Sequence, residues 1–72
     1  MKLHYYPETD SLYIDLNARP GVDSLEVAEG LVIDFDANGH VVGIDIDQAS
    51  KRLDLGSLET VALPPVVARS GG

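Results

Sequence analysis

The sequence predicts an α+β domain, mostly β, in which an antiparallel meander of about five strands carries one short C-terminal helix packed on one face. Two observations support this prediction. Apolar and polar residues alternate through most of residues 2–46, which is the period of strands with one buried face. After Ile46 the alternation stops, and a short stretch with signals for both ends of a helix follows.

Three strands are expected before the centre of the chain, at residues 2–6, 11–16 and 22–28. The first two form a hairpin, because Pro7 to Asp10 is a turn sequence. In the second strand Leu12 and Ile14 point inward and Tyr13 points outward. Residues 17–21 are expected to form a loop from their Asn, Pro and Gly content. The third strand alternates more weakly than the others.

Residues 31–46, LVIDFDANGHVVGIDI, contain the strongest strand signal, two alternating runs joined by Asn38-Gly39. Both turn residues tolerate the positive φ that a two-residue type I′ turn requires. With that turn every apolar cross-strand pair falls on one face: Phe35 with Val42, Ile33 with Ile44, and Leu31 with Ile46. The other face is acidic.

The helix is expected from Gln48 to about Asp54, with Asp47 as its N-cap and Gly56 beyond its end. Ala49 and Leu53 would form its buried pair. The compact domain is therefore residues 1–56. Residues 57–72 are expected to form an extended apolar tail with a flexible end, because two consecutive prolines prevent a helix there.

Charge and composition exclude several classes of function. Twelve acidic and five basic residues give a net charge of −7, which repels nucleic acids and anionic membranes and attracts a cationic protein partner. The chain has no cysteine, so disulfides, thiolate metal sites and thiol nucleophiles are impossible. No apolar run is long enough to span a bilayer. A cytoplasmic location is the expectation.

The length of the chain favours association with a second copy. Seventy-two residues build only a small core, so burial barely offsets the loss of conformational entropy. A homodimer would bury additional apolar surface. The candidate interface residues lie in the tail and on the outer face of the second strand: Leu58, Val61, Leu63, Val66 and Tyr13.

The sharpest motif for a metal site overlaps the central hairpin. Asp34, Asp36, Asn38 and Asp45 stand at the spacing of oxygen ligands in a calcium-binding loop, with Gly39 at the position of its turn glycine. Two features oppose this interpretation: the last ligand is Asp where Glu is usual, and both flanks have strand periodicity. The Asn-Gly hairpin explains the same residues without a metal, and no metal or other cofactor is expected.

Enzymatic activity has no positive support in the sequence. Asp15, Asp34 and Asp45 could form paired carboxylates, but acid–base chemistry also needs a pocket that shifts a pKa. The histidines, His4 and His40, are not at a metal-ligand spacing. Neither a nucleophile-elbow motif nor a glycine-rich phosphate loop is present. The tyrosines of the first hairpin could stack against a ligand, but the negative charge opposes nucleic-acid bases and packing in a core or an interface is favoured.

Four blocks of the sequence together resemble a small bacterial family known as domain of unknown function 2283. The blocks are YYPETDSLYI at residues 5–14, EGLVIDFD at 29–36, GHVVGIDI at 39–46 and ASK at 49–51. Tyr6 departs from the family pattern, which has Asp there. The resemblance implies a compact domain of sheet and helix with no assigned activity. It also implies that some relatives sit beside small toxin-like proteins, which would suit an acidic partner-binding role.

The sequence therefore predicts a non-catalytic module for protein interaction or self-association, in which the acidic face or the apolar tail contacts a partner. The alternative is a metal-binding or small enzymatic domain that uses Asp34, Asp36 and Asp45. A third interpretation is a self-associating domain with no other ligand.

Overall fold

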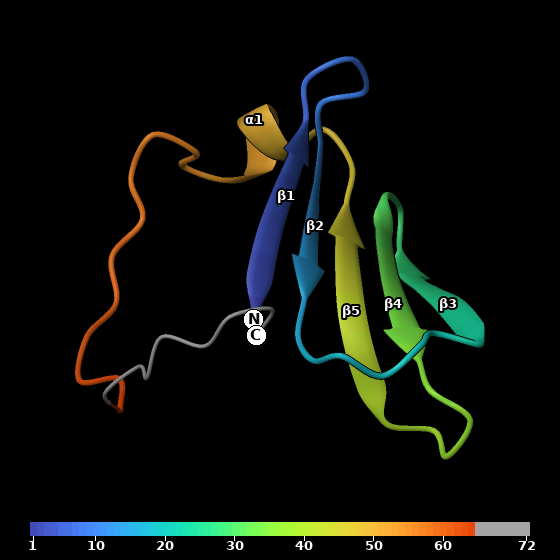
Figure 1. Ribbon diagram of the computed structural model, residues 1–72. Helices are drawn as coiled ribbons and strands as arrows, with labels where there is room; N and C mark the ends of the chain where they lie inside the picture. Colours follow the sequence, from blue (N-terminus) through green and yellow to red (C-terminus); the bar gives the residue numbers. More distant parts are fainter. Residues whose placement is uncertain (65–72) are drawn as a thin grey trace.

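The computed structural model describes residues 1–64, which form one open antiparallel sheet of five strands and a single helical turn (Figure 1). The predicted fold class is confirmed. The elements in chain order are β1 (Lys2–Tyr6), β2 (Ser11–Asp15), β3 (Asp23–Ala28), β4 (Leu31–Phe35), β5 (Val41–Ile46) and α1 (Ala49–Arg52).

The strand order is β1-β2-β5-β4-β3, so the prediction of a simple meander is wrong in this respect. After β2 the chain crosses the ends of β5 and β4 and enters β3 at the far edge of the sheet (Figure 1). This order puts β5 in the centre, where Ile44 lies opposite Ile14 on one side and Ile33 on the other. The strand with the weakest alternation, β3, takes an edge. The order therefore places the apolar residues of β5 between those of β2 and β4.

The two faces of the sheet differ sharply in character. Cross-strand partners share a face in an antiparallel sheet, so the register defines both faces. We call one the apolar face; its residues form two rows, Leu3, Ile14, Ile44, Ile33 and Leu25, and then Tyr5, Leu12, Ile46 and Leu31. We call the other the polar face; it carries Lys2, His4, Tyr13, Asp15, Asp34, Asp45, Val32 and Glu26.

The turn of the central hairpin has three residues instead of the predicted two. The N–H of Gly39 donates to the carbonyl of Asp36 at 3.0 Å, and the N–H of Asp36 donates to the carbonyl of His40 at 2.8 Å. Gly39, at φ 81°, has the positive φ, whereas Asn38 does not. The extra turn residue shifts the pairing by one position, so Phe35 lies opposite Val41 and not Val42. The predicted pair of Phe35 with Val42 is therefore wrong.

A β-bulge at Val42 restores the register. The partner of Asp34 is Gly43 and that of Phe35 is Val41, so Val42 is an extra residue in β5. Beyond the bulge the predicted pairs Ile33–Ile44 and Leu31–Ile46 are confirmed. Val42 itself is 2% exposed and lies under the loop from β2 to β3, where Gly21 packs on Val42 and Asp34.

The helix is shorter than predicted and is capped from a distant turn. It has four residues, its N-cap is Gln48 at φ 52°, and no side chain of the local sequence caps it. The prediction of Asp47 as the N-cap is wrong. Asp10 supplies the acceptors instead: its carbonyl accepts the N–H of Ala49 at 2.8 Å, and its carboxylate accepts the N–H and hydroxyl of Ser50 at 3.1 and 2.6 Å.

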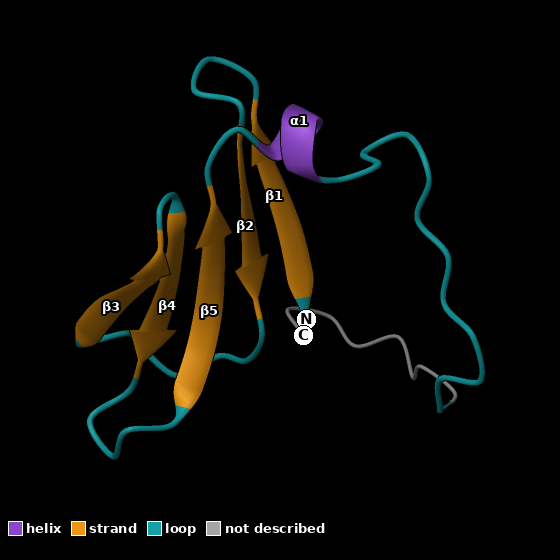
Figure 2. Ribbon diagram, turned by 180° about the vertical axis from the view of Figure 1, so that it is seen from behind, coloured by secondary structure: helices purple, strands orange, loops and turns teal. Residues whose placement is uncertain are grey.

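The core among the described residues is small. The buried apolar side chains are Leu12, Val42 and Ala49. Ala49 confirms one half of the predicted helical pair, but Leu53 is 37% exposed and the other half is wrong. Figure 2 shows why: α1 lies at one end of the sheet beside β1 and leaves most of the apolar face uncovered. Within residues 1–64 no helix combines the length and hydropathy needed to cross a bilayer.

Candidate interaction surfaces

The apolar face has no layer packed over most of its area among the described residues. Ile14, Ile33 and Ile44 at its centre are only partly covered, although they form the middle of a row that spans all five strands. At the two edges, Leu25 is 57% exposed and Leu3 is 45% exposed. A sheet of one layer cannot bury this face by itself. The face is therefore available to another protein surface.

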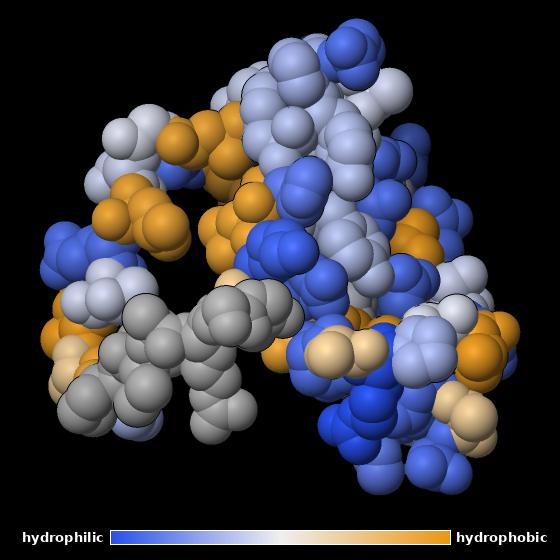
Figure 3. Space-filling view, viewed as in Figure 1, coloured by the Kyte–Doolittle hydropathy of each residue, from blue (hydrophilic) through white to orange (hydrophobic). Residues whose placement is uncertain are grey.

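A groove of about 760 Å³ opens at the β1 side of the apolar face. We call it the β1 groove. One wall is the sheet, through Leu3, Tyr5 and Leu12. The other wall is the chain after α1, which contributes Leu53, Asp54, Leu55, Gly56, Ser57 and Leu58. Figure 3 shows that segment standing away from the sheet, with hydrophobic atoms on both sides of an open space.

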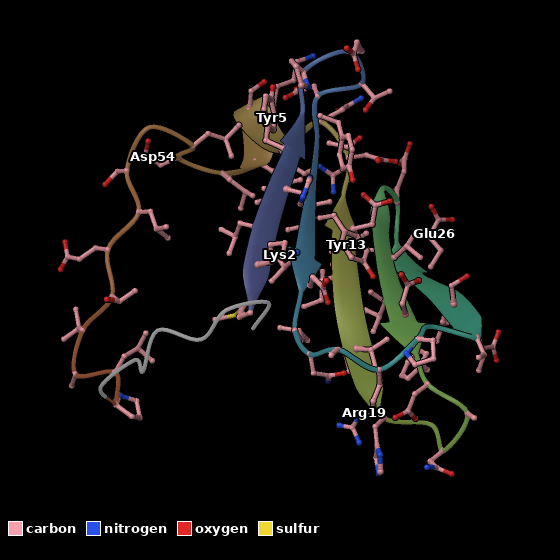
Figure 4. The ribbon with its side chains drawn as sticks, in the orientation of Figure 1. Lys2, Tyr5, Tyr13, Arg19, Glu26 and Asp54 are labelled. Carbon is pink, nitrogen blue, oxygen red and sulfur yellow. The ribbon has the colours of Figure 1, made fainter. Side chains whose placement is uncertain are left out.

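The polar face is organised around Tyr13, which reaches across the central strand. Its hydroxyl donates to Oδ2 of Asp34 at 2.8 Å, so a side chain of β2 binds one of β4 over the top of β5 (Figure 4). The residue beneath the ring is Gly43, where an added Cβ would overlap the Tyr13 hydroxyl. Glycine is thus required in β5 by the aromatic ring that crosses it.

The environment of Tyr13 alters its acidity. The hydrogen bond to Asp34, with partial burial and the nearby carboxylates, raises the pKa of Tyr13 to about 12. Burial raises the pKa of Asp45 on the same face, and the charges of Asp47 and Asp34 add to the effect. The polar face therefore concentrates negative charge around a neutral hydroxyl.

The shifted pKa of Tyr13 predicts a loss of stability in alkali. The folded-state pKa of Tyr13, about 12, exceeds the ordinary value of 10.0. The stability that its neutral hydroxyl adds to the folded state is therefore fully present below pH 10 and is lost as the pH rises toward 12. Tyr13→Phe should lose about 1 kcal/mol at neutral pH and should lack this alkaline component. Urea unfolding between pH 7 and 12 measures both effects. Tyr6→Phe is the matched control, and an identical alkaline profile for Tyr13→Phe and the native protein would contradict the prediction.

Asp36 is a buried carboxylate that organises the central turn. Its Oδ1 accepts the N–H groups of Asn38 and His40, both at 2.9 Å. Its Oδ2 lies 3.4 Å from Nε of Arg19 and 3.7 Å from Nδ1 of His40, and has no hydrogen bond among the described residues. The hydrogen bond from the His40 N–H is the largest cause that lowers the pKa of Asp36. Asp36 thus binds the turn and the β2–β3 loop together.

The residues at calcium-ligand spacing are not brought together. Asp34 accepts the Tyr13 hydroxyl, and Asp36 accepts N–H groups of its own turn. Asn38 is exposed at the tip of the hairpin, while Asp45 lies further along β5 opposite Val32. Within residues 1–64 no three His, Asp or Glu side chains are grouped so as to hold a metal ion.

The predicted interface residues have different surroundings. In the tail, Leu58 is 77% exposed, Val61 76% and Leu63 53%, while Val66 and the predicted flexible end lie outside the described residues. Tyr13 is occupied by its hydrogen bond to Asp34. The β1 groove was not predicted, because the approach of residues 53–58 to β1 leaves no periodic signal in the sequence. The role of Gly43 was not predicted either, although a glycine inside a strand indicates a close contact.

Fold and surfaces together define a small open-sheet domain with one apolar face, one acidic face and an apolar groove at an edge. The sequence model of the family described as Protein of unknown function (DUF2283) matches residues 2–50. The chain belongs to this family, as its sequence blocks indicated, and the match ends within α1. Searches of curated proteins and of solved structures gave no match.

Proposed function

We propose that the protein is a non-catalytic self-association module in which two copies pack through their apolar faces. The observation that supports this proposal is the partial exposure of the two apolar rows that cross the sheet, in which only Leu12 is buried. Two such sheets packed face to face would form a sandwich whose core is about 10 Å thick. The dimer would then contain the second layer that the single chain lacks.

A dimer of this kind leaves both polar faces outward. Each face carries Asp15, Asp34, Asp45 and Glu26, and the whole chain has a charge of −7. This charge would speed encounters with a cationic protein and repel nucleic acids. We infer from the charge and from the cysteine-free composition a cytoplasmic protein whose further partner, such as a toxin-like neighbour, is cationic.

The experiment that tests the proposal uses two adjacent residues of β3 on opposite faces. Leu25 is on the apolar face and Ser24 is on the polar face opposite Asp34, and both are exposed in the single chain. Leu25→Lys places a charge in the proposed interface and should weaken dimerisation at least tenfold, because it removes the burial of a leucine side chain. Ser24→Lys should leave the dimer unchanged.

Light scattering coupled to size exclusion measures the outcome over a range of protein concentrations. The native chain should have twice the monomer mass of 7.7 kDa, and Leu25→Lys should shift toward the monomer. Circular dichroism establishes that each variant is folded. A native chain that stays monomeric at high concentration would overturn the proposal, as would a dimer that both substitutions leave intact.

A further inference from the structure

We propose that in the dimer residues 59–63 of each copy lie in the β1 groove of the other copy. This inference rests on the proposed self-association and specifies its geometry. It assigns an occupant to the groove between β1 and the chain after α1, and it assigns a binding site to the apolar side chains of the tail.

The β1 groove has the size and chemistry of a peptide site. Its volume is about 760 Å³, and both walls are mainly apolar. On the sheet side, Leu3 and Tyr5 remain 45% and 44% exposed. An extended apolar segment placed between the walls would cover these side chains and Leu53 at once. Such burial contributes about 25 cal/mol for each Å² removed from water.

The chain does not fill its own groove. Leu58 stands at the rim and is 77% exposed. A turn marked by the hydrogen bond from Ser57 N–H to the carbonyl of Asp54 precedes it, and beyond the turn the chain runs beside β1 but stands apart from the sheet (Figures 1 and 4). Val61 and Leu63, the next large apolar residues, are 76% and 53% exposed. Each copy therefore has an open groove and an uncovered apolar segment.

Residues 59–63 are suited to an extended binding mode. The segment ETVAL carries a single charge and is followed by Pro64-Pro65, which prevents continuation as a helix. Ala62 has φ 57°, a left-handed conformation that costs about 1–2 kcal/mol for a residue other than glycine. Relaxation to an extended conformation would remove this cost. Fully extended, five residues span about 17 Å, enough to run along a strand of the partner.

The second copy is the occupant that the observations favour. In a two-fold dimer the same two surfaces meet twice, so a segment that covers the partner's groove has its own groove covered in return. The sheet wall of the groove is the β1 edge of the apolar face, so the partner's tail would cover Leu3 and Tyr5 while its sheet covers the remainder of that face. Each copy has one β1 groove and one exposed apolar segment, so two copies can cover both of each other's surfaces.

The absence of native cysteine permits a direct cross-linking test. Leu3→Cys places a thiol in the groove, and Val61→Cys places one in the tail. The two variants, one with a tag that changes its mass, are mixed, allowed to exchange subunits and oxidised mildly. Lys2→Cys is the matched control, because residue 2 neighbours Leu3 in β1 but lies on the polar face. The mixed disulfide of Leu3→Cys with Val61→Cys should exceed that of Lys2→Cys with Val61→Cys at least tenfold.

Two further measurements separate the possible outcomes. In a chain that carries both Leu3→Cys and Val61→Cys, a disulfide within the monomer would show that the tail folds onto its own groove and would overturn the exchange. A light-scattering dimer without the mixed disulfide would also overturn the exchange, while leaving dimerisation through the apolar face in place. A monomeric native chain would overturn both proposals.

Discussion

Gly43→Ala is expected to destabilise the protein by about 1–3 kcal/mol, although alanine normally improves a strand. A Cβ at this position overlaps the Tyr13 hydroxyl, so the aromatic ring must leave the surface of β5. Its hydrogen bond to Asp34 is then lost, together with the link between β2 and β4. Chemical denaturation at a fixed protein concentration measures the effect, because the stability of a dimer depends on concentration.

A second substitution reverses the sign of this effect and thereby identifies its cause. In a Tyr13→Ala background nothing overlaps the new Cβ, so Gly43→Ala should be neutral or stabilising by up to about 1 kcal/mol. The coupling energy of this double-mutant cycle reports the contact between ring and glycine directly. Equal destabilisation in both backgrounds would assign the effect to the backbone of Gly43 and would contradict the role given to Tyr13.

Asp36→Ala is expected to lower Tm by roughly 5–10 °C, because it removes two charge-assisted hydrogen bonds from a buried position. The N–H groups of Asn38 and His40 lose their common acceptor, and Arg19 loses its anionic neighbour. Both the central turn and the loop over Val42 should loosen. Amide exchange should therefore accelerate at these two N–H groups and at Leu16, whose N–H donates to the carbonyl of Val42.

Asp36→Asn separates the two roles of this carboxylate. The amide oxygen can still accept both N–H groups, but the charge facing Arg19 disappears, so the loss of Tm should be about half that of the alanine variant. The depressed pKa of Asp36 means that its charge stabilises the fold above about pH 4 and that this contribution is lost as the pH falls further. The asparagine variant should lack this acid-dependent component. Equal effects of Ala and Asn would refute an acceptor role for Oδ1.

The strands, and which side chains lie on which face of the sheet, were predictable because both depend on the local alternation of apolar and polar residues. The pairs Ile33–Ile44 and Leu31–Ile46 followed from the pattern, since any other register would expose one of the two apolar sets. The turn was not predicted correctly, because Asn38-Gly39 is compatible with both a two-residue and a three-residue loop. The error did not spread through the hairpin, since the bulge at Val42 absorbs the additional residue.

The helix cap and the strand order were not predicted because both depend on contacts between residues far apart in the sequence. The helix cap is Asp10, 40 positions from Ser50, and a search for a cap beside the helix finds Asp47 instead. The order of the strands depends on which pairings bury more apolar surface, and that quantity is known only once the sheet is assembled. The candidate calcium ligands have the sequence spacing of a calcium-binding loop. In the folded chain, however, Asp34 accepts a hydrogen bond from the Tyr13 hydroxyl and Asp36 accepts one from the N–H of Asn38.

The central position of β5 also determines when the domain can fold during synthesis. β5 is the last strand to leave the ribosome, yet it joins β1-β2 to β3-β4. Until it emerges, the first hairpin has no strand on its inner edge, and Leu12 and Ile14 are exposed to other nascent chains. β2 and β5 pair across the whole β3–β4 hairpin, and non-local pairing of this kind slows folding. The complete sheet is therefore expected to form only after β5 has been synthesised.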